Sequence, residues 1–116
     1  MSAPILTVVE TSAFLRRAEK ILSEEEHEQL LFYLASHPTD GDEIQGTGGV
    51  RKLRFAPPSR HGGKSGAMRV CYVAFVDAVC YLLIVFPKNE AANLSAKDKV
   101  TLKQTVNALR RTHSKK

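Results

Sequence analysis

The sequence predicts an α+β domain in which a small, antiparallel-rich sheet packs with two N-terminal helices and one C-terminal helix. Two observations predict this class. Apolar residues recur at helical spacing near both ends of the chain, and the middle holds closely spaced runs of β-branched and aromatic residues. The chain has 116 residues, of which 43% are apolar, enough for one modest core. We therefore expect a single domain over residues 1–116, with the order β-α-α-β-β-β-α.

The N-terminal segment combines a short strand with a helix. Ile5 to Val9 is a β-branched run that suits a first strand. Thr11 or Ser12 can cap a helix whose apolar positions recur from Phe14 to Leu22.

A second helix follows directly. Ser23 and Glu26 have the spacing of a capping box, and the helix should end at His37-Pro38. The three consecutive glutamates 24 to 26 point in different directions on a helix, so they indicate a helix start rather than an acid/base pair.

Three strand candidates and a helix make up the second half. The strands are expected at Val50–Ala56, Met68–Asp77 and Val79–Phe86, with Asp77-Ala78 turning the last two into a hairpin. Ser95 should begin an amphipathic helix through Leu109, and the residues after Arg110 are expected to be a frayed tail.

Alternation decides which side chains the first of these strands exposes. Burying Leu53 and Phe55 turns Lys52 and Arg54 to the opposite face. Periodicity leaves the face of Arg69 open, but burying its unpaired guanidinium would cost on the order of several kcal/mol. We therefore expect Arg69 to lie toward Lys52 and Arg54.

Charge is distributed unevenly along the chain. Residues 1–43 hold nine acidic and three basic side chains, whereas residues 44–116 hold three acidic and fourteen basic ones. Between residues 44 and 76 there is no Asp or Glu, and a positive field without acidic neighbours suits phosphates better than it suits an ordinary solvated strand face. The cations of this segment are Arg51, Lys52, Arg54, Arg60, Lys64 and Arg69.

Common enzyme motifs are missing from the sequence. There is no P-loop, no GxSxG and no HExxH. Cys71 and Cys80 lie in apolar runs without metal-ligand spacing and are expected to be buried thiols. Structural roles are expected for His27 and His37, whereas His61, in the polar segment 57–66, can be a contact or a proton donor.

Targeting signals are also missing. No apolar run reaches about 18 residues, and the N-terminus lacks the basic start and apolar stretch of a secretory signal. We expect a cytoplasmic protein without a membrane segment.

Three stretches together resemble a known family. They are GDEIQGTGGVRKLRF, GGKSGAMRVCYV and CYLLIVFPKNEAANLS. The spacing of these motifs resembles that of the RelE/HigB toxins of bacterial toxin–antitoxin systems. The resemblance covers most of the chain. The resemblance implies a ribosome-dependent mRNA endoribonuclease, or mRNA interferase, that needs no metal or other cofactor. It also implies partners: mRNA in the ribosomal A site and a cognate antitoxin, in the HigB branch commonly a helix-turn-helix protein.

The resemblance also implies a catalytic set. Lys52 and Arg54 would line the RNA groove, Arg69 would face them, and Lys88 would follow at the end of the hairpin. Such cations can stabilise the phosphorane formed when a ribose 2′-hydroxyl attacks the neighbouring phosphate. Lys52 or Lys88 can act as base only where the surrounding cations favour its neutral form. Further RNA contacts are expected from Arg51, Arg60, His61, Lys64 and Asn89.

Two positions depart from the family pattern. Asn89 stands where some relatives carry a second arginine, and Ser95 stands where they carry a tyrosine. Because of these departures, the resemblance does not assign the residues that act as general acid and general base. Tyr72 and Tyr81 can stack on a base or pack in the sheet, and packing is the commoner role of strand tyrosines.

Two other function classes fit the same fold. One is a catalytically silent toxin like the ParE branch, which acts on DNA gyrase and lacks the basic cluster. The other is an RNA-binding module that only occupies the ribosome. The joint presence of Lys52, Arg54, Arg69 and Lys88 favours the nuclease.

Overall fold

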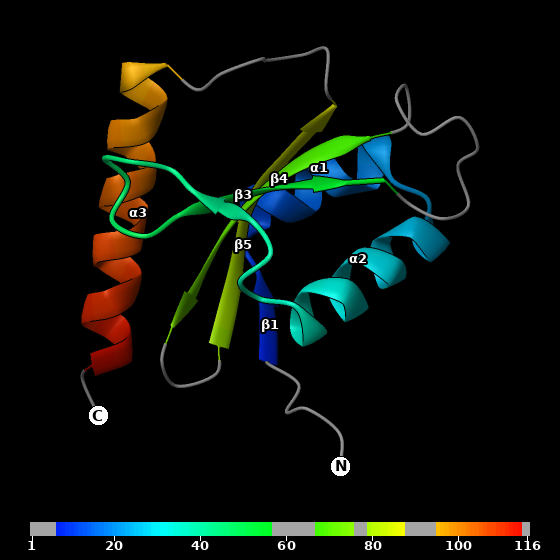
Figure 1. Cartoon of the computed structure of the whole chain (residues 1–116), viewed down its shortest axis with the longest axis horizontal. Helices are drawn as coiled ribbons and strands as arrows, with labels where there is room; N and C mark the ends of the chain where they lie inside the picture. The colour runs from blue at the N-terminus through cyan, green and yellow to red at the C-terminus, as the bar shows by residue number, and fades with distance from the viewer. Residues whose placement is uncertain (1–6, 57–66, 76–78, 88–94, 115–116) are drawn as a thin grey trace.

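The computed structural model describes residues 7–56, 67–75, 79–87 and 95–114. They form an α+β fold with three helices and a five-stranded mixed sheet, which confirms the predicted class (Figure 1). In chain order the elements are β1 (Thr7–Glu10), α1 (Ser12–Ile21), α2 (Glu24–Ser36), β2 (Asp42–Glu43), β3 (Arg51–Phe55), β4 (Met68–Phe75), β5 (Val79–Pro87) and α3 (Ala96–Ser114).

The sheet has the strand order β1-β5-β4-β3-β2. Strands β2, β3, β4 and β5 pair antiparallel, whereas β1 runs parallel to β5, with Thr7 opposite Val79. The two-residue strand β2 was not predicted, because a strand this short leaves no alternation in the sequence. The hairpin pairing of β4 with β5 is confirmed, while the expected turn residues lie outside the described part of the chain.

The helix starts follow the predicted signals. Thr11 caps α1, since its hydroxyl accepts a hydrogen bond from the Phe14 backbone N–H at 3.2 Å. The capping box of α2 is confirmed: the Ser23 hydroxyl accepts from the Glu26 N–H at 3.1 Å, and the Glu26 carboxylate accepts from the Ser23 N–H at 2.9 Å. The consecutive glutamates therefore serve the helix start.

Helix α3 begins as predicted but extends further. The Ser95 hydroxyl accepts from the Asp98 N–H, and the Asp98 carboxylate accepts from the Ser95 N–H. The expectation of a frayed tail after Arg110 was wrong up to Ser114, because the helical backbone continues to that residue.

Each face of the sheet is covered by helices (Figure 1). Helices α1 and α2 pack on one face through Phe14, Ala18, Leu30 and Leu34, which meet Leu53, Val70 and Leu82. Helix α3 packs on the other face through Leu102 and Val106. These two residues meet Val50, Cys71, Val73, Leu83 and Phe86. The sheet thus has one face for the α1–α2 pair and one for α3.

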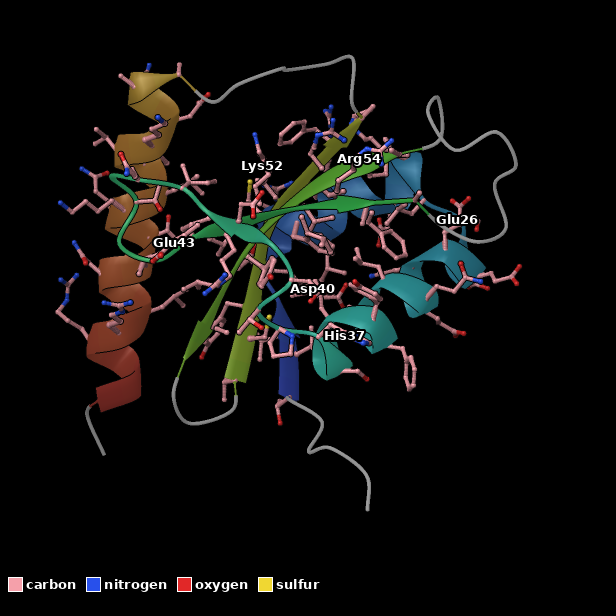
Figure 2. The ribbon with its side chains drawn as sticks, in the orientation of Figure 1. Glu26, His37, Asp40, Glu43, Lys52 and Arg54 are labelled. Carbon is pink, nitrogen blue, oxygen red and sulfur yellow. The ribbon has the colours of Figure 1, made fainter. Side chains whose placement is uncertain are left out.

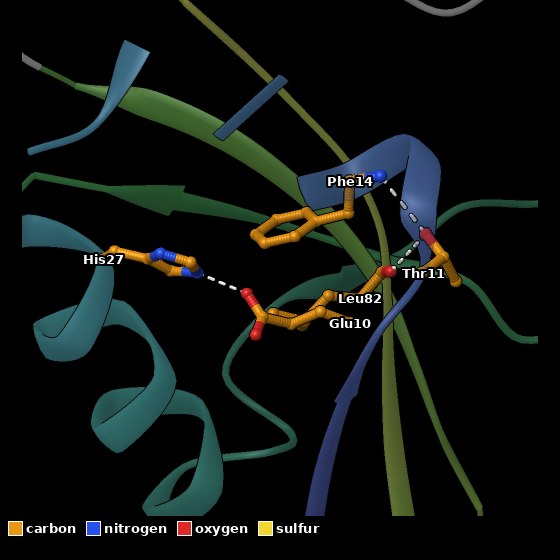
Figure 3. A network of polar contacts seen from close by, with 5 residues as sticks. All are labelled: Glu10, Thr11, Phe14, His27 and Leu82. Atoms are coloured by element: carbon orange, nitrogen blue, oxygen red, sulfur yellow. Dashed lines mark hydrogen bonds and ion pairs between the residues drawn. The ribbon is translucent and has the colours of Figure 1, made fainter. Parts of the chain in front are cut away.

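Polar contacts connect the first strand to its surroundings (Figure 3). The Thr11 hydroxyl also donates to the Leu82 carbonyl at 2.9 Å, which ties the start of α1 to β5. His27 on α2 contacts the Glu10 carboxylate on β1. The contact supports the structural role predicted for His27. In the part of the chain described here, we find no helix with the length and apolar character needed to span a membrane.

Candidate nucleic-acid interface

The glycine-rich loop determines where β3 begins. Gly46, Gly48 and Gly49 have φ angles of 83°, 79° and 116°, a region that side chains with a Cβ rarely adopt. Between them, the buried Thr47 hydroxyl donates to the Ile44 carbonyl at 2.6 Å and accepts from the Val50 N–H at 3.1 Å. The loop is therefore a closed turn that leads directly into β3.

Strand register places the predicted cations together. Arg54 on β3 lies directly opposite Arg69 on β4, and Lys52 lies opposite Cys71. Side chains two residues apart on a strand share a face, so Lys52, Arg54 and Arg69 lie on the face that α3 partly covers. Figure 2 shows Lys52 and Arg54 projecting to the same side of β3. We call these three residues the cationic cluster.

The cationic cluster is not neutralised by the contacts described. Arg54 is exposed and Arg69 is half-buried. The Nη1 atom of Arg69 is buried and has no hydrogen-bond partner among the described residues. Like charges directly opposite on an antiparallel pair are destabilising, and an unpaired buried donor adds a further cost. An anion between the two guanidinium groups would relieve both.

Apolar side chains continue the same face onto β5. Phe86 lies opposite Arg69, and Ile84 lies opposite Cys71. Phe86 is buried against α3, but Ile84 remains 37% exposed. Sequence analysis missed Ile84, because it lies in a continuous apolar run without alternation. A register shift between Cys71 and Tyr72 further obscures the pattern.

Arg51 takes a different position from the other cations of β3. It lies opposite Tyr72, on the face that carries Leu53 and α2. Its guanidinium donates to the Gly41 carbonyl at 2.7 Å and to the Thr39 carbonyl at 3.3 Å. The structure therefore does not bring Arg51 to the cationic cluster. It supports the connection between α2 and β2 instead.

The remaining predicted site residues lie outside the described part of the chain. They are Arg60, His61, Lys64, Lys88 and Asn89. Of these, Lys88 directly follows Pro87, the last residue of β5, which lies opposite Met68.

The two cysteines are buried thiols, as predicted. Burial raises the pKa of Cys71 to about 11, although the positive charge of Lys52 acts in the opposite direction. Burial raises the pKa of Cys80 to about 12. Both thiols are therefore protonated at neutral pH and are poor nucleophiles.

The tyrosines of the sheet serve packing. Tyr72 is fully buried in the α1–α2 core, as predicted for the commoner role of a strand tyrosine. Tyr81 is partly buried against the α3 core. His37 ends α2 and stacks on Tyr33, which supports its predicted structural role.

A concavity lies beside the glycine-rich loop. This open groove of about 520 Å³ is bounded by Glu43–Gly46, Gly48, Gly49 and Arg110. The Arg110 guanidinium donates to the Gly48 carbonyl at 2.8 Å, which fastens α3 to the loop. Sequence analysis could not find this contact, because 62 residues separate its two partners.

No protein-family model matches the chain. Among the described residues, no group of three His, Cys, Asp or Glu side chains is arranged to hold a metal ion. The geometry of the described side chains is therefore the main structural support for a function.

Proposed function

We propose that this protein is an mRNA endoribonuclease that acts on the ribosome and inhibits translation. The observation that carries the proposal is the cationic cluster, in which Arg54 and Arg69 lie directly opposite each other and the buried Nη1 of Arg69 lacks a partner among the described residues. A phosphodiester provides the oxygens that two guanidinium groups can bind with paired donors. The sequence resemblance to RelE/HigB toxins points to the same substrate.

The reaction proposed is an internal transfer of the phosphoryl group. The ribose 2′-oxygen forms a bond to the adjacent phosphorus and loses its proton, while the bond from phosphorus to the 5′-oxygen breaks and that oxygen gains a proton. Negative charge builds on the phosphorane between these steps. Arg54 and Arg69 would bind its oxygens, and Lys52 would add a third positive charge.

The proposed partners follow from the charge of the cluster. Its natural inhibitor would be a cognate antitoxin, of the helix-turn-helix type that the resemblance implies, with acidic residues against Lys52, Arg54 and Arg69. The protein would act in the cytoplasm, where translating ribosomes present mRNA. Raising the salt concentration should weaken the antitoxin complex, and a salt-independent complex would argue against electrostatic pairing.

Cleavage on the ribosome is the direct test. Expression without a partner should halt growth by stopping translation, and primer extension on translated messages should find discrete cuts within codons. Arg69→Ala should keep the fold and still bind the antitoxin through Lys52 and Arg54, but it should reduce cleavage by about 100-fold or more, the scale of losing one transition-state charge partner. Arg16→Ala is a matched control, because Arg16 is an exposed arginine on α1.

Other outcomes would replace the proposal. A folded Arg69→Ala protein that cut at the parental rate would remove Arg69 from the mechanism. Failure of DNA replication before any loss of messages would favour the gyrase-binding class. Ribosome binding with intact messages would favour an RNA-binding module without catalysis.

A further inference from the structure

Ile84 is an exposed apolar residue beside a cluster of cations. It is 37% exposed and lies on β5 beyond Leu82, the last β5 residue that pairs with β1, so that only β4 is paired with the strand at Ile84. Burying an aliphatic side chain removes apolar surface from water and so stabilises a complex. A partly exposed isoleucine on this part of the sheet therefore offers apolar contact area to a partner with an apolar surface.

Strand pairing fixes where Ile84 lies relative to the cations. Ile84, Cys71 and Lys52 form one row across β5, β4 and β3. Adjacent strands are about 4.8 Å apart, so Ile84 lies about 10 Å from Lys52. Arg69 is nearer, on the strand next to Ile84 and two residues along from Cys71, where it shares the same face.

This spacing matches the two parts of a nucleotide. A phosphate bound at the cationic cluster leaves its base free to lie a few ångströms away on the sheet. The flat face of a base is apolar, so it can pack on an exposed aliphatic side chain and remove apolar surface from water. A base can lie flat on a sheet only when it is unpaired and unstacked.

We propose that Ile84 packs against an unpaired base of an RNA strand whose phosphate is bound by the cationic cluster. The inference rests on the proposed function to the extent that RNA is the ligand, but it does not require cleavage. It makes Ile84 a base-contacting residue that helps to decide which nucleotide is held at the cluster.

Two oligonucleotides separate base contacts from phosphate contacts. One is a short 2′-O-methyl RNA, which lacks the attacking hydroxyl and cannot be cut by the proposed reaction. The other is an abasic oligonucleotide of equal length and charge. Their affinities are measured at low salt, where contacts to phosphate are strongest.

The variants are chosen to keep the strands intact. Ile84→Thr retains the β-branched shape and removes most of the apolar contact. Val9→Thr is the matched control, because Val9 is also 37% exposed, but it lies on β1 opposite Tyr81. We expect Ile84→Thr to weaken binding of the base-bearing oligonucleotide by about 5- to 10-fold, through lost apolar burial, and to leave the abasic one unchanged. Lys52→Ala should weaken both equally, and Val9→Thr neither.

The results distinguish this inference from the proposed function. Equal effects of Ile84→Thr on both oligonucleotides, or no effect on either, would overturn the role of Ile84 alone. Base-dependent binding through Ile84 without any cutting of messages would support the role of Ile84 and overturn the nuclease. If neither oligonucleotide bound, or if only an acidic apolar peptide bound, the role of Ile84 would be overturned, whereas cuts in translated messages would still support the nuclease.

Discussion

Removing the hydroxyl of Tyr72 tests how the connection between α2 and β2 is held. Tyr72 is 0% exposed, and its hydroxyl accepts a hydrogen bond from the Gly41 N–H at 2.9 Å and donates one to the Pro38 carbonyl at 2.8 Å. Tyr72→Phe removes both bonds while the ring remains. Because each bond contributes about 1 kcal/mol and the Gly41 N–H would stay buried, we expect a loss of about 2–3 kcal/mol in the free energy of unfolding.

The same change at Tyr33, a half-buried tyrosine whose hydroxyl contact is exposed, provides the control. The Tyr33 hydroxyl contacts the Asp40 carboxylate at an exposed position. Exposed contacts of this kind contribute little, so Tyr33→Phe should cost less than about 1 kcal/mol. Each variant loses one hydroxyl, but Tyr72→Phe loses two hydrogen bonds, one of them buried, whereas Tyr33→Phe loses one exposed contact.

Urea unfolding followed by circular dichroism measures both variants, and amide exchange at Gly41 gives a local readout. Tyr72→Phe should lower the denaturation midpoint without changing the slope, and it should speed exchange of the Gly41 amide. Equal losses for the two variants, or unchanged exchange at Gly41, would refute the reasoning from buried hydrogen bonds.

Three further predictions concern α3, the thiols and the glycine-rich loop. Val106→Ala should cost about 2 kcal/mol in a urea titration because Val106 is fully buried, whereas Val100→Ala, at a 54% exposed position of the same helix, should cost less than about 0.5 kcal/mol. The thiols of Cys71 and Cys80 ionise more readily in the unfolded chain, where their pKa is near 9.0, than in the folded protein, where it is about 11 and about 12. The free energy of unfolding should therefore fall as pH rises from 9 toward 12. A flat profile of this free energy against pH would contradict the effect of burial. Gly49→Ala should cost about 1–3 kcal/mol in thermal unfolding because φ is 116°, and a neutral result would mean that the loop can readjust.

Local signals in the sequence were sufficient to predict the helices and most of the sheet. The capping box of Ser23 and Glu26 forms within four residues, so its signal depends on nothing distant. Alternation in β3 put Leu53 and Phe55 in the core and turned Lys52 and Arg54 outward. The same alternation puts Arg51 on the face of Leu53. The prediction that Arg51 contacts RNA together with Lys52 and Arg54 overlooked this signal.

For β4, charge decided which face Arg69 takes, a choice that the periodicity of the sequence left open. Alternation allowed Arg69 on either face, and the cost of burying an unpaired guanidinium predicted the face shared with Arg54. The structure places Arg69 there, directly opposite Arg54. That residue-to-residue pairing depends on register between strands, which no single segment of the sequence contains.

By itself, the sequence determined the fold class, the helix starts and the faces of β3, because caps and alternation act between near neighbours. Only the tertiary structure decided the short strand β2, the contact of Arg110 with Gly48 and the exposure of Ile84. These features depend on which segments pair and on how far α3 covers the sheet. The physical reason is that packing between distant segments produces no pattern of apolar and polar residues in the sequence of either segment.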